Sequence, residues 1–336
     1  MLLKRTQTRR IPDMRRTLAA LLLTALVPTP ALAGGEPRLP RPEAVTPTAP
    51  APLPAVGWQA ITLSASNLLG SAVSRLRLYT VAPDELPVQV ARGTLPAPGN
   101  PLLVLLADNR VGRQNLERLS VWYDPAGGLV QRCRVGFGRR DSRAKCYRYE
   151  ARSLLRERRE SAVTAAEVEA QPDWLHDGAS SALTLARDWP VSSAGRLALP
   201  QAIPRTAGLV SPTLLLPLAS AASLHAAGDR ETYYVHTDHD FFRVVLEVSG
   251  HERIEVDYRR ETAAGEQPVR GQVEALVIRL QVNPLGEPEN GFELLGLRPP
   301  LTLLLDPATR LPLALRGDAP RLGPGEVRLE AARLSR

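Results

Sequence analysis

The chain has 336 residues, of which 44% are hydrophobic, and a formal net charge of +7 at pH 7. Six basic residues and one acidic residue fall within residues 1–33, so the remainder holds 36 basic and 34 acidic residues and is close to neutral. Near neutrality removes the general electrostatic argument for a nucleic-acid partner. The roughly 300 residues that follow can bury a large core, as one large β-rich domain or two smaller ones.

Residues 1–33 have the pattern of a secretory signal peptide. Two arginines follow Met14, an apolar run covers residues 18–27, and Ala-Leu-Ala precedes Gly34. The apolar run of about ten residues is short for a bilayer span, which needs roughly 20. We therefore predict cleavage before Gly34, export to the periplasm and no transmembrane anchor, with either Met1 or Met14 as the start.

Proline is frequent in the segment after the predicted cleavage site, residues 34–55. Because proline has no backbone N–H and cannot complete a β-ladder, we expect an extended tether here. Residues 56–336 are then predicted to form a single β-rich domain, with a helical or loop insertion at about residues 153–229.

Apolar and polar residues alternate from Trp58 onward, which is typical of half-buried β-strands. Gly, Pro, Asn and Asp separate the alternating blocks. The strands predicted in this half of the chain cover residues 58–66, 72–81, 101–108, 116–124 and 128–137.

The two cysteines, Cys133 and Cys146, lie on either side of a predicted turn. Alternation on both sides makes the segment a hairpin that brings the thiols face to face. In an oxidising compartment we predict a disulfide, which would contribute roughly 3 kcal/mol by closing the loop. The alternative is a pair of free or metal-bound thiols, although no third ligand lies nearby for zinc. The basic turn, residues 138–145, is interpreted as solvated, with contact to anionic lipid or a partner as the alternative.

Residues 153–171 combine strong helix formers with helical spacing, so we expect a helix whose charged residues 156–160 are solvated. Residues 177–189 and 211–229 are predicted to hold short helices because each begins at Asp or Ser. The Gly- and Pro-marked segment between them, residues 190–212, is predicted to be loop. These elements would pack on one face or end of the sheet.

In residues 241–258 the apolar set at 242, 244, 246 and 248 shares one face, and after Ser249 and Gly250 a second set at 254, 256 and 258 takes over, with charged residues between its members. We interpret the segment as a half-solvated antiparallel hairpin with its turn at Ser249 and Gly250. Further strands are predicted over residues 272–282, 301–306, 311–317 and 325–334.

The sequence Asp-Pro-Ala occurs at residues 124–126 and again at 306–308, each time between two predicted strands. Proline fixes φ at the second position of a turn without cost, so both sites are predicted turns. We interpret the repeat as convergent turn chemistry, with a duplicated domain as the alternative.

The segment His-Thr-Asp-His-Asp, residues 236–240, packs two histidines and two aspartates between apolar blocks. We predict a polar turn between two strands, in which Asp238 and Asp240 hydrogen-bond turn amides and both imidazoles face water. The alternative is a metal site in which the backbone turns His236 and His239 towards each other beside an aspartate. Such a ligand set would suit zinc or another transition metal.

The sequence contains no complete catalytic or cofactor motif. Residues 178–182 come nearest to a Gly-x-Ser-x-Gly elbow but lack the second glycine. No phosphate-binding or dinucleotide-binding glycine motif occurs, so we predict no cofactor and assign no catalytic residue. Carboxylate-pair catalysis stays open, because one sequence does not show which acidic groups converge.

Three segments carry a resemblance to a known family: residues 233–259, Leu-Gly-Leu-Arg at 295–298, and Leu-Asp-Pro-Ala-Thr-Arg-Leu-Pro-Leu at 305–313. They resemble exported proteins of Gram-negative bacteria grouped as the domain of unknown function family 3108. The resemblance implies a periplasmic protein with a mostly antiparallel, strongly curved sheet, and it brings no catalytic residues. Proteins of that general shape include half-barrels that carry lipoproteins or hold apolar ligands, which is an analogy of fold alone.

We therefore predict a mainly β fold: a large, curved antiparallel sheet, half-barrel or barrel-like, with a few short helices. Our first hypothesis is a non-enzymatic periplasmic protein whose concave face binds an apolar envelope ligand or a protein partner. The second is a metal-dependent enzyme or metal-binding protein that uses residues 236–240. The third is a structural or assembly factor of the cell envelope that docks through an exposed sheet edge.

Overall fold

The computed structural model describes residues 54–67, 70–82, 101–112, 115–169 and 185–335. The predicted signal peptide, and the predicted tether up to residue 53, lie outside these ranges. None of the helices within them has the length and apolar character needed to cross a bilayer.

The described residues contain fifteen β-strands, all in one sheet. The strands are β1 (Trp58–Asn67), β2 (Gly70–Val81), β3 (Leu102–Val111), β4 (Asn115–Asp124), β5 (Gly128–Phe137), β6 (Ser142–Tyr149), β7 (Ser153–Ser161), β8 (Val191–Ala198), β9 (Leu209–Val210), β10 (Arg230–His236), β11 (Phe241–Thr262), β12 (Gly265–Pro284), β13 (Arg298–Leu305), β14 (Pro312–Ala319) and β15 (Gly323–Leu334).

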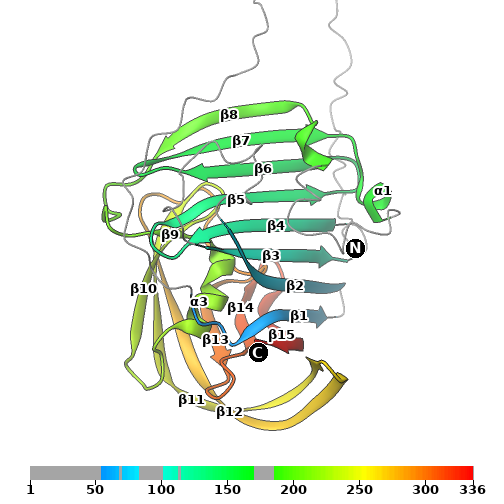
Figure 1. Ribbon diagram of the computed structural model, residues 1–336, viewed down its shortest axis with the longest axis vertical. Coiled ribbons are helices and arrows are strands. Elements are labelled where there is room, and N and C mark those ends of the chain that lie inside the picture. The colour runs from blue at the N-terminus through cyan, green and yellow to red at the C-terminus, as the bar shows by residue number, and fades with distance from the viewer. Residues whose placement is uncertain (1–53, 68–69, 83–100, 113–114, 170–184, 336) are drawn as a thin grey trace, which may run out of the picture. The chain divides into compact units, whose positions relative to one another are not determined.

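Twelve strands close into a barrel in the order β4-β3-β2-β1-β15-β14-β13-β12-β11-β10-β9-β5, with β5 pairing back to β4. The pairings are antiparallel except those of β9 with β10 and β5, and a short contact between β11 and β15. Strands β6, β7 and β8 continue the sheet from β5 outside the ring (Figure 1). The predicted mainly β, barrel-like antiparallel fold with a few short helices is confirmed.

The ring closes where Gly128 of β5 meets Gly208, just before β9. A Cβ placed on Gly128 would lie 2.6 Å from Gly208 Cα, and one on Gly208 would lie 2.8 Å from Gly128 Cα. Gly128 also has a φ of +88°, which residues with a side chain rarely adopt. The two backbones can therefore meet only because both residues are glycine.

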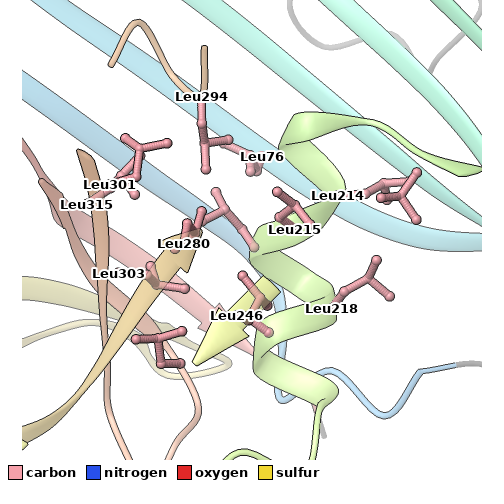
Figure 2. Packing of buried hydrophobic residues seen from close by; sticks show 14 of the residues in the cluster. Leu76, Leu214, Leu215, Leu218, Leu246, Leu280, Leu294, Leu301, Leu303 and Leu315 are labelled. Atoms are coloured by element: carbon pink, nitrogen blue, oxygen red, sulfur yellow. The ribbon is translucent and has the colours of Figure 1, made fainter. Parts of the chain in front are cut away.

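A helix occupies the interior of the barrel (Figure 1). The short helix η2 (Pro212–Leu214) continues into α3 (Leu215–Ala221), and residues 215–220 are all buried. Apolar residues surround the helix axis, which is typical of a helix enclosed in a core. Leucines 214, 215 and 218 share one cluster with leucines of β2, β11, β12, β13 and β14 (Figure 2). The helix predicted within residues 211–229 is thus confirmed for 212–221.

Trp58 of β1 and Arg310 of the turn between β13 and β14 hold α3 in place. Trp58 Nε1 donates a hydrogen bond of 3.0 Å to Ser220 Oγ. The Arg310 guanidinium donates at 2.7 to 3.1 Å to the carbonyl oxygens of Ala219, Ser220, Ala222 and Leu224. Carbonyls at a helix end lack partners within the helix, so Arg310 satisfies groups that would otherwise be unpaired.

Both predicted Asp-Pro-Ala turns are confirmed. Asp124 Oδ1 accepts from the Ala126 N–H at 2.9 Å, and Asp306 Oδ1 accepts from the Ala308 N–H at 2.8 Å. The second turn places Arg310 at the end of α3, with a φ of 59°.

The helix predicted over residues 153–171 is wrong for 153–161, which form β7, and the loop predicted over 190–212 is wrong for 191–198, which form β8. Of the described residues in the first predicted helix, α1 (Ala165–Glu169) is helical. Helix propensity is a weak preference that strand pairing overrides, and β7 pairs with neighbours on both sides. Of the predicted helix 177–189, residues 185–187 form one helical turn and 177–184 lie outside the described ranges.

The predicted hairpin turn at Ser249 and Gly250 is also wrong. Strand β11 continues through this point as a β-bulge, with a register shift between Val248 and Gly250 and a Gly250 φ of 145°. A bulge inserts one residue, so the even-numbered apolar residues before and after it lie on opposite faces of the sheet, although their spacing in the sequence does not change. The actual turn joins β11 to β12 between Thr262 and Gly265.

Candidate functional site

The polar turn predicted at residues 237–240 joins β10 to β11 and lies against the inner face of β5 and β6. Thr237 N–H donates to Asp240 O at 2.9 Å, and Asp240 N–H donates to Thr237 Oγ1 at 3.1 Å. These two bonds close the turn within itself. The side chains of Asp238, His239 and Asp240 are left to contact other parts of the chain.

Asp238 accepts from three cations that rise from β5 and β6. Arg132 Nη2 lies 3.1 Å from Oδ1, while Arg134 Nη1 and Lys145 Nζ lie 3.2 and 2.8 Å from Oδ2. Burial raises the pKa of Asp238, but the neighbouring cations outweigh burial and hold that pKa well below its ordinary range. The carboxylate is thus charged and fully engaged in ion pairs.

Arg132 fixes the backbone of the same turn. Its side chain is 4% exposed, and its nitrogens donate to His236 O at 2.8 Å and Thr237 O at 2.7 Å. The guanidinium also lies over the Tyr147 ring, 4.6 Å from the centroid, and Tyr147 OH donates to Asp238 O at 2.8 Å. Burial, and then the charge of Asp238, raise the pKa of Tyr147 to about 12, so its hydroxyl stays a donor.

His236 is fully buried between aromatic rings. Its Nδ1 lies 2.8 Å from the Tyr149 hydroxyl, and the rings of Tyr147 and Phe241 have centroids 5.0 and 4.7 Å away. Burial, and then the charge of Arg132, hold the pKa of His236 well below 6.5, so the imidazole is neutral. The prediction that both imidazoles face water is therefore wrong for His236.

The other two candidate ligands have partners of their own. His239 Nδ1 lies 3.5 Å from Glu289 Oε2, with 26% of the side chain exposed. Asp240 accepts from the backbone N–H groups of Glu289 at 2.8 Å and Asn290 at 3.0 Å, and so holds the loop that follows β12. The prediction that Asp238 and Asp240 bond amides of their own turn is therefore wrong: the amides bound by Asp240 belong to that loop, and Asp238 binds cations.

The structure does not bring His236, Asp238, His239 and Asp240 together as metal ligands. His236 faces an aromatic pocket, Asp238 faces cations, and Asp240 faces amides. Within the described residues, no group of three or more His, Cys, Asp or Glu side chains is placed to hold a metal ion. The cluster is instead a buried contact between β10 and the strands β5 and β6.

Cys133 and Cys146 form the predicted disulfide. They are directly opposed residues of β5 and β6, in the register that the hairpin prediction requires. Side chains alternate along a strand, so the disulfide lies on the opposite face of the sheet from Arg132 and Arg134.

Five basic side chains of β5, β6 and β7 share one face of the sheet, because directly opposed residues point the same way. One row across the strands is Arg134, Lys145 and Arg158, and the next is Arg132, Tyr147 and Arg156. We call the five basic residues among them the basic face. Sequence reasoning missed it by placing residues 156–160 on a helix, although arginine at every second position is a strand signal.

The basic face becomes less neutralised towards the edge of the sheet. Arg132, Arg134 and Lys145 share Asp238, and Arg134 also pairs with Glu117. Arg158 pairs with Glu160 of its own strand at 2.5 Å. The side chain of Arg156 forms neither a hydrogen bond nor an ion pair with any residue that the structure describes, and its Nε is buried without a partner. Positive charge is therefore left over beside β8.

Strand β8 ends the sheet, with β7 as its single neighbour among the described strands. All of its residues except Leu197 are exposed, and its sequence Val-Ser-Ser-Ala-Gly-Arg-Leu-Ala carries one charge, which pairs with Glu150. Native proteins usually guard an edge with charges, proline or a covering segment, because an open edge is a template for another strand. No family model, no curated protein and no solved structure matched the chain when it was compared with them.

Proposed function

We propose that this chain is a non-enzymatic protein of the bacterial envelope that binds an extended segment of another protein along the free edge of β8. The observation that carries the proposal is the edge itself: eight residues, seven of them exposed, that pair with β7 alone among the strands that the structure describes. An exposed edge offers a row of backbone donors and acceptors to a partner strand, which supplies affinity through main-chain hydrogen bonds.

The packing of the barrel favours a protein partner on the outside over an apolar ligand inside. A concave face that binds a lipid chain needs space lined by apolar side chains. Here α3 takes that space, and residues 215–220 are all buried against the wall. An assembly or scaffolding role therefore suits the geometry better than carriage of an apolar ligand.

A metal-dependent enzyme at residues 236–240 has less support, because the side chains it would use already serve the fold. Asp238 is bound by three cations and Asp240 by two amides. Releasing either carboxylate for a metal would break these bonds.

Export to the periplasm and the relationship to family 3108 are parts of the same proposal. The pattern of residues 1–33 supports export, and the disulfide between Cys133 and Cys146 suits an oxidising compartment. The family relationship rests on residues 233–259, 295–298 and 305–313 alone.

Site-specific photo-crosslinking in the native host tests the proposal. A photoreactive amino acid at Ser193, on the edge, should give a discrete protein adduct in the periplasmic fraction. The same group at Arg270, an exposed site on the β11 and β12 hairpin, should not. The edge adduct should disappear when Ala194→Pro is added. Identical adducts from both positions, or an adduct that survives Ala194→Pro, would refute docking at β8.

A further inference from the structure

The backbone of β8 shows which of its groups a partner strand would meet. Leu199 N–H donates to Arg152 O at 2.9 Å. This bond shows which opposed residues of β7 and β8 are hydrogen-bonded pairs and which are not. Residues that exchange both bonds with the neighbour alternate with residues whose N–H and C=O point away from it. Ser193 and Gly195 therefore bond β7, whereas Ala194 and Arg196 direct their backbone groups outward.

The side chains of β8 leave the basic face open to a strand beyond it. Ser193 lies opposite Arg158 and Gly195 lies opposite Arg156, so all four share one face. Serine and glycine are too small to cover the guanidinium groups from the edge side. An added strand would run about 10 Å from β7, since neighbouring strands lie about 4.8 Å apart, and long side chains span that gap.

The charge on this face selects one kind of partner. Arg156 has no acidic partner in the described part of the chain, Arg158 has one from its own strand, and the Nε atoms of both are buried without a hydrogen bond. On the opposite face of the sheet, the added strand would lie beside Ala194 and Arg196, and Arg196 is already paired with Glu150. One face of the added strand is thus matched to carboxylates, and the other is matched to small or apolar residues.

We propose that the segment bound at β8 is acidic, with Glu or Asp at every second position, and that Arg156 and Arg158 bind those carboxylates. This inference rests on the proposed docking function. Guanidinium groups suit carboxylates because their donors match both oxygens. The basic face is therefore the specificity determinant, and the β8 backbone provides the general affinity.

Peptide binding to the purified chain tests this inference. The probes are two fluorescent eight-residue peptides that alternate Val with Glu or Val with Gln, measured by anisotropy. We expect the Glu peptide to bind about tenfold more tightly, as two charge-assisted contacts allow. The double variant Arg156→Gln and Arg158→Gln should reduce that ratio to less than about twofold. The matched control, Arg139→Gln and Arg140→Gln at the exposed hairpin tip, removes the same charge and should keep the ratio.

Ala194→Pro separates failure of this inference from failure of the proposed function. It removes an outward N–H while sparing the bonds to β7, so both peptides should lose binding. Equal binding of both peptides, abolished by Ala194→Pro, would overturn the acidic segment and keep edge docking. A Glu preference that persists in the double variant would overturn the role of the two arginines. Binding that ignores Ala194→Pro, or no binding of either peptide, would overturn both proposals.

Discussion

Arg132 donates a hydrogen bond of 2.8 Å to the carbonyl oxygen of His236 and so ties β5 to the end of β10. The same guanidinium reaches Thr237 O at 2.7 Å and the Asp238 carboxylate at 3.1 Å. Three polar groups of one turn therefore depend on a single buried side chain. Arg134 reaches the same carboxylate, but its side chain is 47% exposed.

Replacing Arg132 should be far more harmful than replacing Arg134. We expect Arg132→Gln to lower the free energy of unfolding by about 3 kcal/mol, because buried carbonyls and part of a buried charge lose their partner. Arg134→Gln should cost less than about 1 kcal/mol, as expected for a half-exposed ion pair. Urea unfolding followed by circular dichroism measures both values, and equal losses would contradict the role of Arg132.

The barrel closure predicts a second pair of effects. Gly128→Ala and Gly208→Ala should each destabilise the fold by about 2 kcal/mol or more, because the added Cβ meets the facing backbone. Gly136→Ala, in the same strand as Gly128 but with nothing within 4 Å of its Cβ position, should be neutral or slightly stabilising. Thermal unfolding of the three variants checks this. Three similar melting temperatures would show that closure of the barrel does not require glycine at positions 128 and 208.

Most strands could be predicted because period-two alternation is a local property of each strand. The predicted 58–66 and 128–137 correspond to β1 and β5 within a residue, and 311–317 overlaps β14 from Pro312 onward. Closure of the ring could not be predicted, because β9 has two residues and its contact depends on glycines far apart in sequence. Strand β7 was mistaken for a helix because residues 156–160 are good helix formers, and only pairing with β6 and β8 decides against it.

The candidate site also has a part that was predictable from local sequence and a part that was not. Local turn chemistry identified the polar turn at 237–240 and its two aspartates. The partners were not predictable, because Arg132 lies 104 residues before the carbonyl it binds, and no local pattern connects them. The burial of His236 follows from those distant contacts. The apolar residues on either side of the segment, Val235 and Phe241, are the local sign of it.

The disulfide gives a prediction that needs no binding partner. The oxidised protein should contain no free thiol, and the double variant Cys133→Ser and Cys146→Ser should lose about 3 kcal/mol of stability because the unfolded chain is no longer cross-linked. Thiol titration in denaturant and urea unfolding measure the two effects. Two titratable thiols in protein purified without reductant would contradict the bond.

His236 should make stability depend on pH. Burial and Arg132 hold its pKa in the folded chain below the ordinary value of 6.5, so the unfolded chain binds the extra proton as the pH falls. The free energy of unfolding should therefore decrease below about pH 6.5, by at most about 1.4 kcal/mol per pH unit for one group. Asp238, whose pKa is also lowered, adds a loss only near and below its ordinary value of 3.8.

The interval from about pH 6.5 to 5.5 therefore isolates the histidine, since Asp238 and the two glutamates with lowered pKa values, Glu167 and Glu326, lose stabilisation only near and below their ordinary values of 3.8 and 4.5. In His236→Gln the slope of unfolding free energy against pH should flatten across this interval, whatever the absolute stability of the variant. His239→Gln removes the partly exposed neighbouring ring and should keep most of the slope. Urea unfolding at half-unit pH steps measures all three chains. A slope that is unchanged in His236→Gln, or one that is lost equally in His239→Gln, would show that burial of His236 does not control the acid sensitivity of the fold.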